Sequence, residues 1–176
     1  DGAEWVERNP ASQPSARVSH AMAYDSARGV TVLFGGSDGS FLEDTWEWDG
    51  TDWVQCNPVT HPPERWGHAM AYDSARGVVV LFWGYDDYDM PDDTWEWNGI
   101  NWARRIPPSH PPSRSGHAMA YDSARGVVVL FGGSLSYDKL ADTWEWDGTD
   151  WVERSPATQP PARSSHTMAY DSARGV

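Results

Sequence analysis

The sequence has few basic residues, a single cysteine and no long apolar run. Only 13 of its 176 residues are Lys or Arg, against 26 Asp or Glu, so the net charge is −13. Proteins bind nucleic acids and anionic membrane surfaces through Lys and Arg, so this charge argues against both partners. No apolar stretch reaches the roughly 18 residues that a membrane-spanning helix needs, and we expect no membrane insertion.

Cysteine and helical patterns are equally scarce. Cys56 stands alone, which excludes an intramolecular disulfide, and no Cys/His cluster has the spacing of a zinc site. Helical periodicity appears nowhere in the chain. We therefore expect no metal, no cofactor and no helix.

Tryptophan, by contrast, is abundant, with 12 residues. Such a density of aromatic side chains indicates either a repeated packing device or a binding surface. Ten of the 12 follow a repeat, namely Trp5, Trp46, Trp48, Trp53, Trp95, Trp97, Trp102, Trp144, Trp146 and Trp151. Only Trp66 and Trp83 lie outside it, so most of the tryptophan is expected to serve packing.

The repeat is defined by two motifs. The run His-x-Met-Ala-Tyr-Asp-Ser-Ala-Arg-Gly-Val begins at His20, His68, His117 and His166, with spacings of 48, 49 and 49 residues. The run Asp-Thr-Trp-Glu-Trp begins at Asp44, Asp93 and Asp142. An internal repeat of this length determines the architecture, because each copy must form the same structural unit.

Each repeat is predicted to form four short strands. Residues 20–25 alternate between larger and smaller side chains with a period of two, and residues 25–29 follow as a turn. Val30–Phe34 is an apolar run that stops at a glycine doublet. A variable loop leads to Thr45–Trp48, and the hairpin signal Asp49-Gly50 precedes a fourth strand that carries Trp53 and Val54.

Four-stranded units of this length are typical of β-propeller blades, which must stack because one blade cannot bury both of its faces. We predict an all-β fold, a β-propeller segment of four-stranded antiparallel blades with about 3.5 repeats. A single segment is expected over 1–176. Its repeats span approximately 17–64, 65–113 and 114–162, with partial repeats at 1–16 and 163–176.

The partial repeats predict one fourth strand at the start and one first strand at the end, which makes 14 strands with the three full repeats. Two interpretations follow: a piece of a longer propeller, or chains that assemble into a ring or filament through their incomplete terminal blades. Assembly has a difficulty, because the first strand of a blade is innermost and the fourth is outermost. The two do not pair without the strands between them.

The repeat resembles the Kelch family. The resemblance rests on Leu-Phe-Gly-Gly at 33–36 and 130–133, followed by Trp48 or Trp146 and then by Trp53 or Trp151 five residues later. It is most similar to bacterial secreted Kelch-like repeats related to the central domain of galactose oxidase. One copy departs from the pattern, because Trp83 replaces the first glycine of the doublet.

The Kelch resemblance implies a propeller of usually six or seven blades that binds proteins or glycans, in an extracellular or cell-surface location. The catalytic activity of the enzymes in this family is not expected here. The chain shows no set of copper ligands and no Tyr–Cys pair that can be aligned with theirs. Serines next to histidine, such as Ser19 and Ser165, lack the sequence context of a catalytic nucleophile. We therefore do not expect an enzyme.

The repeated histidines allow two interpretations. Each follows an arginine by three residues, at Arg17, Arg65, Arg114 and Arg163. A metal site is one interpretation, since imidazole is a common ligand. A residue that recurs in every blade more simply forms a hydrogen bond to the next blade. The repeated Asp25 and Arg28 are expected to stabilise the turn, with the carboxylate accepting backbone N–H bonds.

Positions that differ between repeats are the candidate binding residues, because the repeated scaffold does not require them. The variable loops span 37–43, 85–92 and 134–141. The candidates are Trp66, Trp83, Tyr85, Asp86, Asp87, Tyr88, Asp89 and Tyr137. For the acidic loop the alternatives are a solvated loop and a calcium site, although its spacing lacks a calcium-loop pattern. For Trp66 and Trp83 they are local packing and a binding hot spot.

The leading hypothesis is a noncatalytic propeller that binds a protein or a glycan. The alternative, from a different functional class, is a structural repeat protein that self-associates through its terminal strands. An enzyme built on a propeller scaffold is the third hypothesis. Because fold does not fix function, the choice among them depends on the site.

Overall fold

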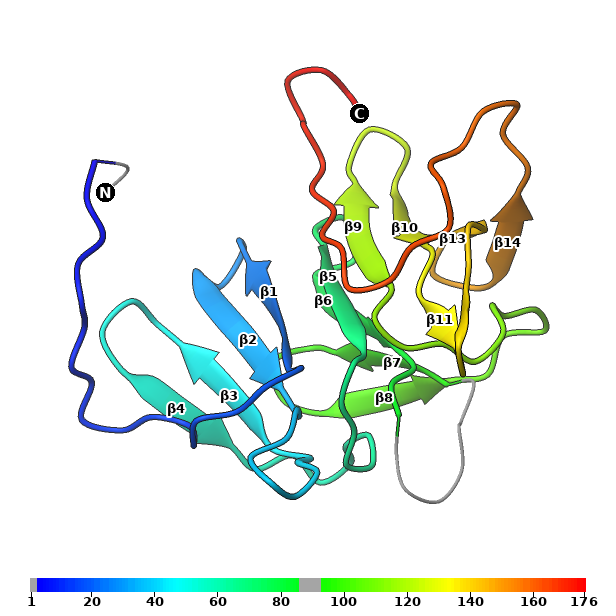
Figure 1. Cartoon of the computed structure of the whole chain (residues 1–176). Coiled ribbons are helices and arrows are strands. Elements are labelled where there is room, and N and C mark those ends of the chain that lie inside the picture. The colour runs from blue at the N-terminus through cyan, green and yellow to red at the C-terminus, as the bar shows by residue number, and fades with distance from the viewer. Residues whose placement is uncertain (1–2, 86–92) are drawn as a thin grey trace.

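A computed structural model describes residues 3–85 and 93–176. Within these ranges the chain contains strands and no helix, so no helix could span a membrane. Three four-stranded antiparallel sheets follow one another along the chain, which confirms the predicted all-β fold and its blade-like units. The sheets do not close into a ring, as Figure 1 shows.

The three sheets are called the first, second and third blades. The first contains β1 (Ala21–Asp25), β2 (Val30–Phe34), β3 (Thr45–Trp48) and β4 (Trp53–Cys56). The second contains β5 (Ala69–Asp73), β6 (Val78–Phe82), β7 (Thr94–Trp97) and β8 (Trp102–Arg105). The third contains β9 (Ala118–Asp122), β10 (Val127–Phe131), β13 (Thr143–Trp146) and β14 (Trp151–Arg154), and a small hairpin of β11 (Ser134–Leu135) and β12 (Asp138–Lys139) lies between its middle strands.

The register is the same in every blade. Ala21 pairs with Phe34, and the equivalent residues pair in the same way in the second and third blades. Trp48 pairs with Trp53 across the Asp-Gly turn, as their counterparts do. Since side chains alternate between the two faces of a strand, this register places both tryptophans of each pair on one face of the blade.

The turn between the first two strands of each blade is held by its aspartate. Asp25 Oδ1 accepts hydrogen bonds from the backbone N–H groups of Ala27 and Arg28, at 3.0 and 3.1 Å. Asp73 and Asp122 do the same in the other blades. Gly29 follows with a φ of 71°, which glycine adopts without steric cost. The predicted role of the repeated aspartate is confirmed.

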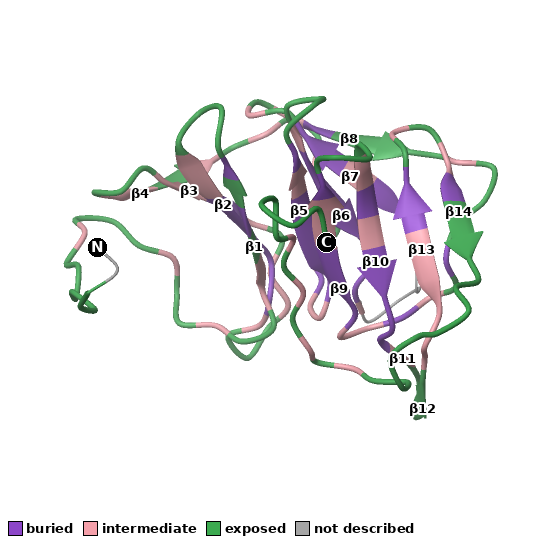
Figure 2. Ribbon diagram, turned by 90° about the horizontal axis from the view of Figure 1, so that it is seen from above, coloured by how far each residue is buried: buried purple, intermediate pink, exposed green. Residues whose placement is uncertain are grey.

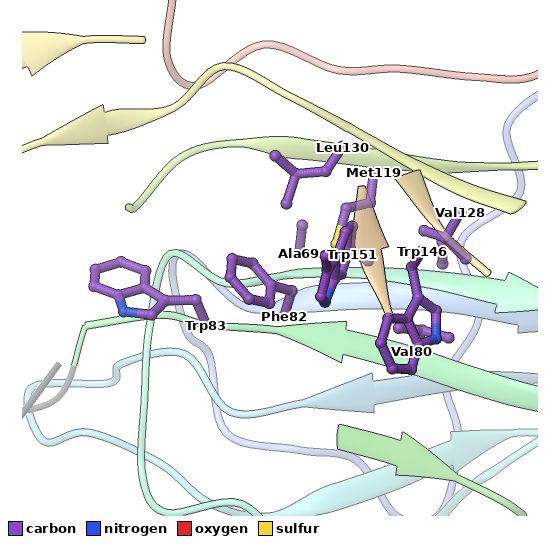
Figure 3. Close-up of a cluster of buried hydrophobic side chains, with 10 residues drawn as sticks. Ala69, Val80, Phe82, Trp83, Met119, Val128, Leu130, Trp146 and Trp151 are labelled. Carbon is purple, nitrogen blue, oxygen red and sulfur yellow. The ribbon is translucent and has the colours of Figure 1, made fainter. Parts of the chain in front are cut away.

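The blades pack face to face, and the core lies between them. The first strands β1, β5 and β9 are neighbours, while β4 and β14 lie at opposite outer edges (Figure 1). One apolar cluster joins the first and second blades, and another joins the second and third (Figure 3). Buried residues are concentrated in the second and third blades, whereas β4 has no buried residue and the N-terminal segment is largely exposed (Figure 2).

The two terminal strands predicted from the repeat are not formed. Residues 3–10 and 166–171 contain no strand, and the side chain of Trp5 is fully exposed. The prediction was wrong because a strand needs a paired neighbour for its backbone groups. The first strand of each blade also begins one residue after the repeated histidine, at Ala21 rather than His20.

Candidate functional site

The first tryptophan of each Asp-Thr-Trp-Glu-Trp run is bonded within its own blade. Trp46 Nε1 donates to Asp44 Oδ2 at 2.6 Å. Trp95 and Trp144 make the same bond to the aspartate two residues before them, at 2.5 and 2.7 Å. These three indoles therefore help to order the start of the third strand, and their N–H bonds stay within their own blade.

The same aspartates bind the repeated arginines. Arg65 Nη1 and Nη2 donate to the two carboxylate oxygens of Asp93 at 2.7 and 3.0 Å, and both side chains are almost fully buried. Burial alone would raise the pKa of the equivalent Asp142, but hydrogen bonds from Arg114 and Trp144 outweigh burial and lower this pKa. These ion pairs fix the beginning of each repeat to its own sheet.

The remaining tryptophans of the second blade reach the first blade. Trp97 Nε1 donates to Glu47 Oε1, and Trp102 Nε1 donates to Thr45 Oγ1, both at 2.9 Å. We call the face of a blade that carries such a tryptophan pair its donor face. The opposite face, which carries the threonine and glutamate, is its acceptor face.

The third blade repeats these bonds on the second. Trp146 Nε1 donates to Glu96 Oε1 at 3.2 Å, and Trp151 Nε1 donates to Thr94 Oγ1 at 2.9 Å. All four donor indoles at the two boundaries are about 1% exposed. The periodic tryptophans at these boundaries thus form a packing device rather than a binding surface, as the repeat predicted.

One repeated histidine forms the expected bond between blades. His68 Nε2 donates to the Phe34 carbonyl oxygen at 3.1 Å, and its ring packs edge-on against the Phe34 ring. His117 packs in the same way against Phe82. Burial first, and then the nearby Arg114, lower the pKa of His117 to about 3. No group of three or more His, Cys, Asp or Glu residues within 3–85 and 93–176 is placed to hold a metal ion.

Two of the candidate binding residues meet at the boundary of the first and second blades. The backbones of Trp66 and Tyr85 exchange two hydrogen bonds, at 3.1 and 2.8 Å, and their ring centroids lie 5.7 Å apart. Phe41, from the first blade, lies 6.3 Å from each of these rings. Phe41, Trp66 and Tyr85 are called the aromatic cluster. All three side chains are half-buried.

The aromatic cluster is not part of the repeated scaffold. The backbone bridge between Trp66 and Tyr85 recurs in the other blades, but there it joins Val18 to Ser37 and Ser115 to Ser134. The same backbone geometry therefore forms without any aromatic residue. Phe41 was not among the candidates, although it is the one aromatic residue of the variable loop 37–43.

The other candidates are placed differently. Trp83 is 2% exposed and lies at one end of the apolar cluster between the second and third blades, next to Phe82 (Figure 3). Its burial favours the packing interpretation. Tyr137 is fully exposed in the turn between β11 and β12, and none of the ring contacts among the described residues joins it to the aromatic cluster. Asp86, Asp87, Tyr88 and Asp89 lie outside the described residues.

No protein-family model matches the chain, and no curated protein sequence matches it. The class that its geometry defines is an all-β repeat protein of four-stranded, propeller-like blades.

Proposed function

We propose that this chain is a noncatalytic binding module of the Kelch propeller type, which binds a protein or a glycan at the aromatic cluster. The observation that carries the proposal is the meeting of Phe41, Trp66 and Tyr85. At the bridge positions of Trp66 and Tyr85 the other blades have only valine or serine. Aromatic residues that the scaffold does not need, gathered in one place, are what binding hot spots contain.

The chemistry of the aromatic cluster suits a ligand with apolar and hydroxyl groups. Half-buried rings offer flat apolar surface to a sugar ring or to a side chain, and the Tyr85 phenol can donate or accept a hydrogen bond. The net charge of −13 disfavours an anionic ligand. A neutral glycan, or a protein surface that is neutral or basic, fits this cluster best.

The Kelch assignment is supported by the glycine doublets. Gly36 and Gly133 both have φ values near 100°, and their N–H groups donate to carbonyl oxygens of Arg65 and Arg163 in the following repeat, at 2.9 and 2.8 Å. A Cβ atom at Gly36 would lie 2.7 Å from the Val18 carbonyl oxygen, so the doublet allows the close approach of two chain segments. An extracellular or cell-surface location follows from the family resemblance alone.

The test is a glycan array together with a pull-down of proteins, carried out with the chain and with the double variant Trp66→Ser/Tyr85→Ser. This variant copies the Ser115–Ser134 bridge of the third blade, so we expect the backbone bridge to form in it. We expect the double variant to lose at least tenfold in affinity for any ligand found, which corresponds to about 1.4 kcal/mol.

The matched control is Tyr137→Ser, which removes a fully exposed tyrosine that makes no ring contact with the aromatic cluster, and it is expected to bind as the unaltered chain does. Unchanged binding by the double variant would contradict the proposed site. Turnover of a substrate by the unaltered chain would contradict the noncatalytic function.

A further inference from the structure

The three rings of the aromatic cluster lie close enough together to share one ligand group. Their centroids are 5.7, 6.3 and 6.3 Å apart, and the rings are inclined to one another at 35°, 60° and 87° rather than stacked flat. A cation is attracted to an aromatic ring when it lies within about 6 Å of the ring centroid. Because the three centroids form so small a triangle, one cation above it is within that reach of every ring.

The arginines next to the aromatic cluster are already neutralised. Arg65, which directly precedes Trp66, is bonded to Asp93, and its side chain is 1% exposed. Arg17, one residue before the bridge of the first blade, is bonded to Asp44, and its side chain is 3% exposed. Among the described residues, the cation–π contact that is found lies at the boundary of the second and third blades. The two arginines therefore neither cover the rings nor add free positive charge beside them.

The segments that carry the rings also carry two carboxylates. Glu43 lies two residues after the phenylalanine of the cluster, and Glu64 lies two residues before its tryptophan. These segments run side by side, because the Arg65 N–H donates to the Leu42 carbonyl oxygen at 3.1 Å. Within 3–85 and 93–176 neither glutamate is paired with an arginine or a lysine, and the ionisable neighbour of Glu43 is His61, at 3.9 Å. The surroundings of the cluster are thus negative.

The third repeat shows that the scaffold requires neither this ring of the first blade nor the two carboxylates. The aligning backbone bond is the same there, since the Arg163 N–H donates to the Leu140 carbonyl oxygen at 3.1 Å. Around that bond the third repeat has a lysine for Phe41 and an alanine for each of the two glutamates, at Lys139, Ala141 and Ala162. Aromatic rings and negative charge therefore occur together at the boundary of the first and second blades without being part of the repeat.

We propose that the ligand of the aromatic cluster is a basic segment of another protein, and that an arginine side chain of this segment lies against the rings. A guanidinium group stacks on aromatic rings and is more weakly hydrated than an ammonium group, so it gives up less hydration on binding. Glu43 and Glu64 attract the segment locally, and the net charge of −13 favours its approach.

This inference rests on the proposed function, because it names the partner of the same site and chooses a basic protein over a neutral glycan. Its test is fluorescence anisotropy with a short labelled peptide in which arginines alternate with glycine and serine. The comparison peptide has citrulline, which is similar in shape but uncharged, in place of every arginine. We expect the citrulline peptide to bind at least tenfold more weakly, and added salt to weaken the arginine peptide by screening its attraction to the carboxylates.

A pair of matched variants separates local charge from net charge. Glu43→Ala/Glu64→Ala copies the third repeat and leaves all three rings in place, and we expect it to bind the arginine peptide at least fivefold more weakly. Asp138→Asn/Glu153→Gln removes two exposed carboxylates from the third blade, so the net charge changes equally, and we expect its affinity to stay within twofold of the unaltered chain. Near-ultraviolet circular dichroism establishes that both variants are folded.

The failure of this inference differs from the failure of the proposed function. Trp66→Ser/Tyr85→Ser is expected to lose at least tenfold in affinity for the arginine peptide. The inference alone is overturned if the arginine peptide does not bind, if the citrulline peptide binds as tightly, if both carboxylate variants weaken binding equally, or if a neutral glycan binds more tightly at a site that this double variant removes. The proposed function fails as well if the double variant binds every ligand as the unaltered chain does.

Discussion

The same five residues, Asp-Thr-Trp-Glu-Trp, have different surroundings in the second and first blades. In the second blade, Trp97 and its partner Trp102 are 1% exposed and bonded to the neighbouring blade. In the first blade, Trp48 and Trp53 are half-exposed although their stacking is nearly unchanged. The strand and its register are therefore local properties, while burial and hydrogen bonding of the indoles depend on the neighbouring blade.

The glutamate of the run shows the same contrast. Glu96 is almost fully buried and is paired with Arg76 and Arg105. Glu47 is more exposed and is paired with Arg28, because Cys56 stands where the second blade has Arg105. The second and third blades therefore place two arginines around this glutamate, and the first blade has only one of them.

The largest difference in stability between the blades is expected when the arginine that pairs with the first aspartate of the Asp-Thr-Trp-Glu-Trp run is replaced. Arg65→Met leaves the Asp93 carboxylate buried without its ionic partner, which should destabilise the fold by about 4 kcal/mol. Arg17→Met should cost clearly less, because the Asp44 side chain is 20% exposed and water can solvate it. Urea unfolding of both variants measures the difference. Equal losses would contradict this account of the two blades.

Trp83 stands in the second blade where the other blades have Gly35 and Gly132, and variants at this position show how the blade accommodates the larger residue. Its φ is 50°, a left-handed value that is strained for a bulky residue, yet its side chain fills the core. Trp83→Ala should lose about 3 kcal/mol of unfolding free energy. Trp83→Gly should lose about 1 kcal/mol less, because glycine relieves the backbone strain. Thermal and urea unfolding compare the two, and a glycine variant less stable than the alanine variant would refute the strain argument.

Acid should destabilise the boundary between the second and third blades. The pKa of His117 is lowered to about 3, mainly by burial, so the folded state favours the neutral ring. Stability is then complete above pH 6.5 and falls, by up to about 1.4 kcal/mol per pH unit, as the pH drops from 6.5 toward 3. His117→Phe should flatten the dependence between pH 7 and 5. An unchanged slope in that variant would exclude His117 as its source.

The smallest expected effect comes from completing the charge network of the first blade. Cys56→Arg would place a guanidinium near Glu47, as Arg105 lies near Glu96, and should stabilise the chain by about 0.5 kcal/mol. Burial, followed by the Glu47 charge, raises the pKa of the Cys56 thiol to about 11, so removal of the thiol costs no thiolate contact. Cys56→Ser is the matched control. A loss of stability in the arginine variant would contradict the comparison of the two networks.

The strands could be predicted because their signals are local. Alternation over residues 20–25, the apolar run Val30–Phe34 and the Asp49-Gly50 turn each specify a neighbouring strand pair, and the blades follow from their repetition. The terminal strands could not be predicted correctly, since a segment such as that around Trp5 becomes a strand only when a paired neighbour is present.

The candidate site was predicted in part for a similar reason. Trp66 and Tyr85 were found because they break the repeat, but their contact with Phe41 crosses a blade boundary that no local pattern describes. The division of the repeated tryptophans into those bonded within a blade and those bonded between blades is also tertiary. Trp95 and Trp97 are two residues apart on one strand, yet Trp95 bonds to its own blade and Trp97 to the first blade.

The most direct test of the central claim, that a neighbouring blade secures the repeated indoles, is the hydrogen exchange of each tryptophan Nε1–H by NMR. It is measured at a concentration at which the chain is monomeric. The account predicts strong protection for Trp97, Trp102, Trp146 and Trp151, and fast exchange for Trp48, Trp53 and Trp5. Equal protection of Trp48 and Trp97 in the monomer would contradict it.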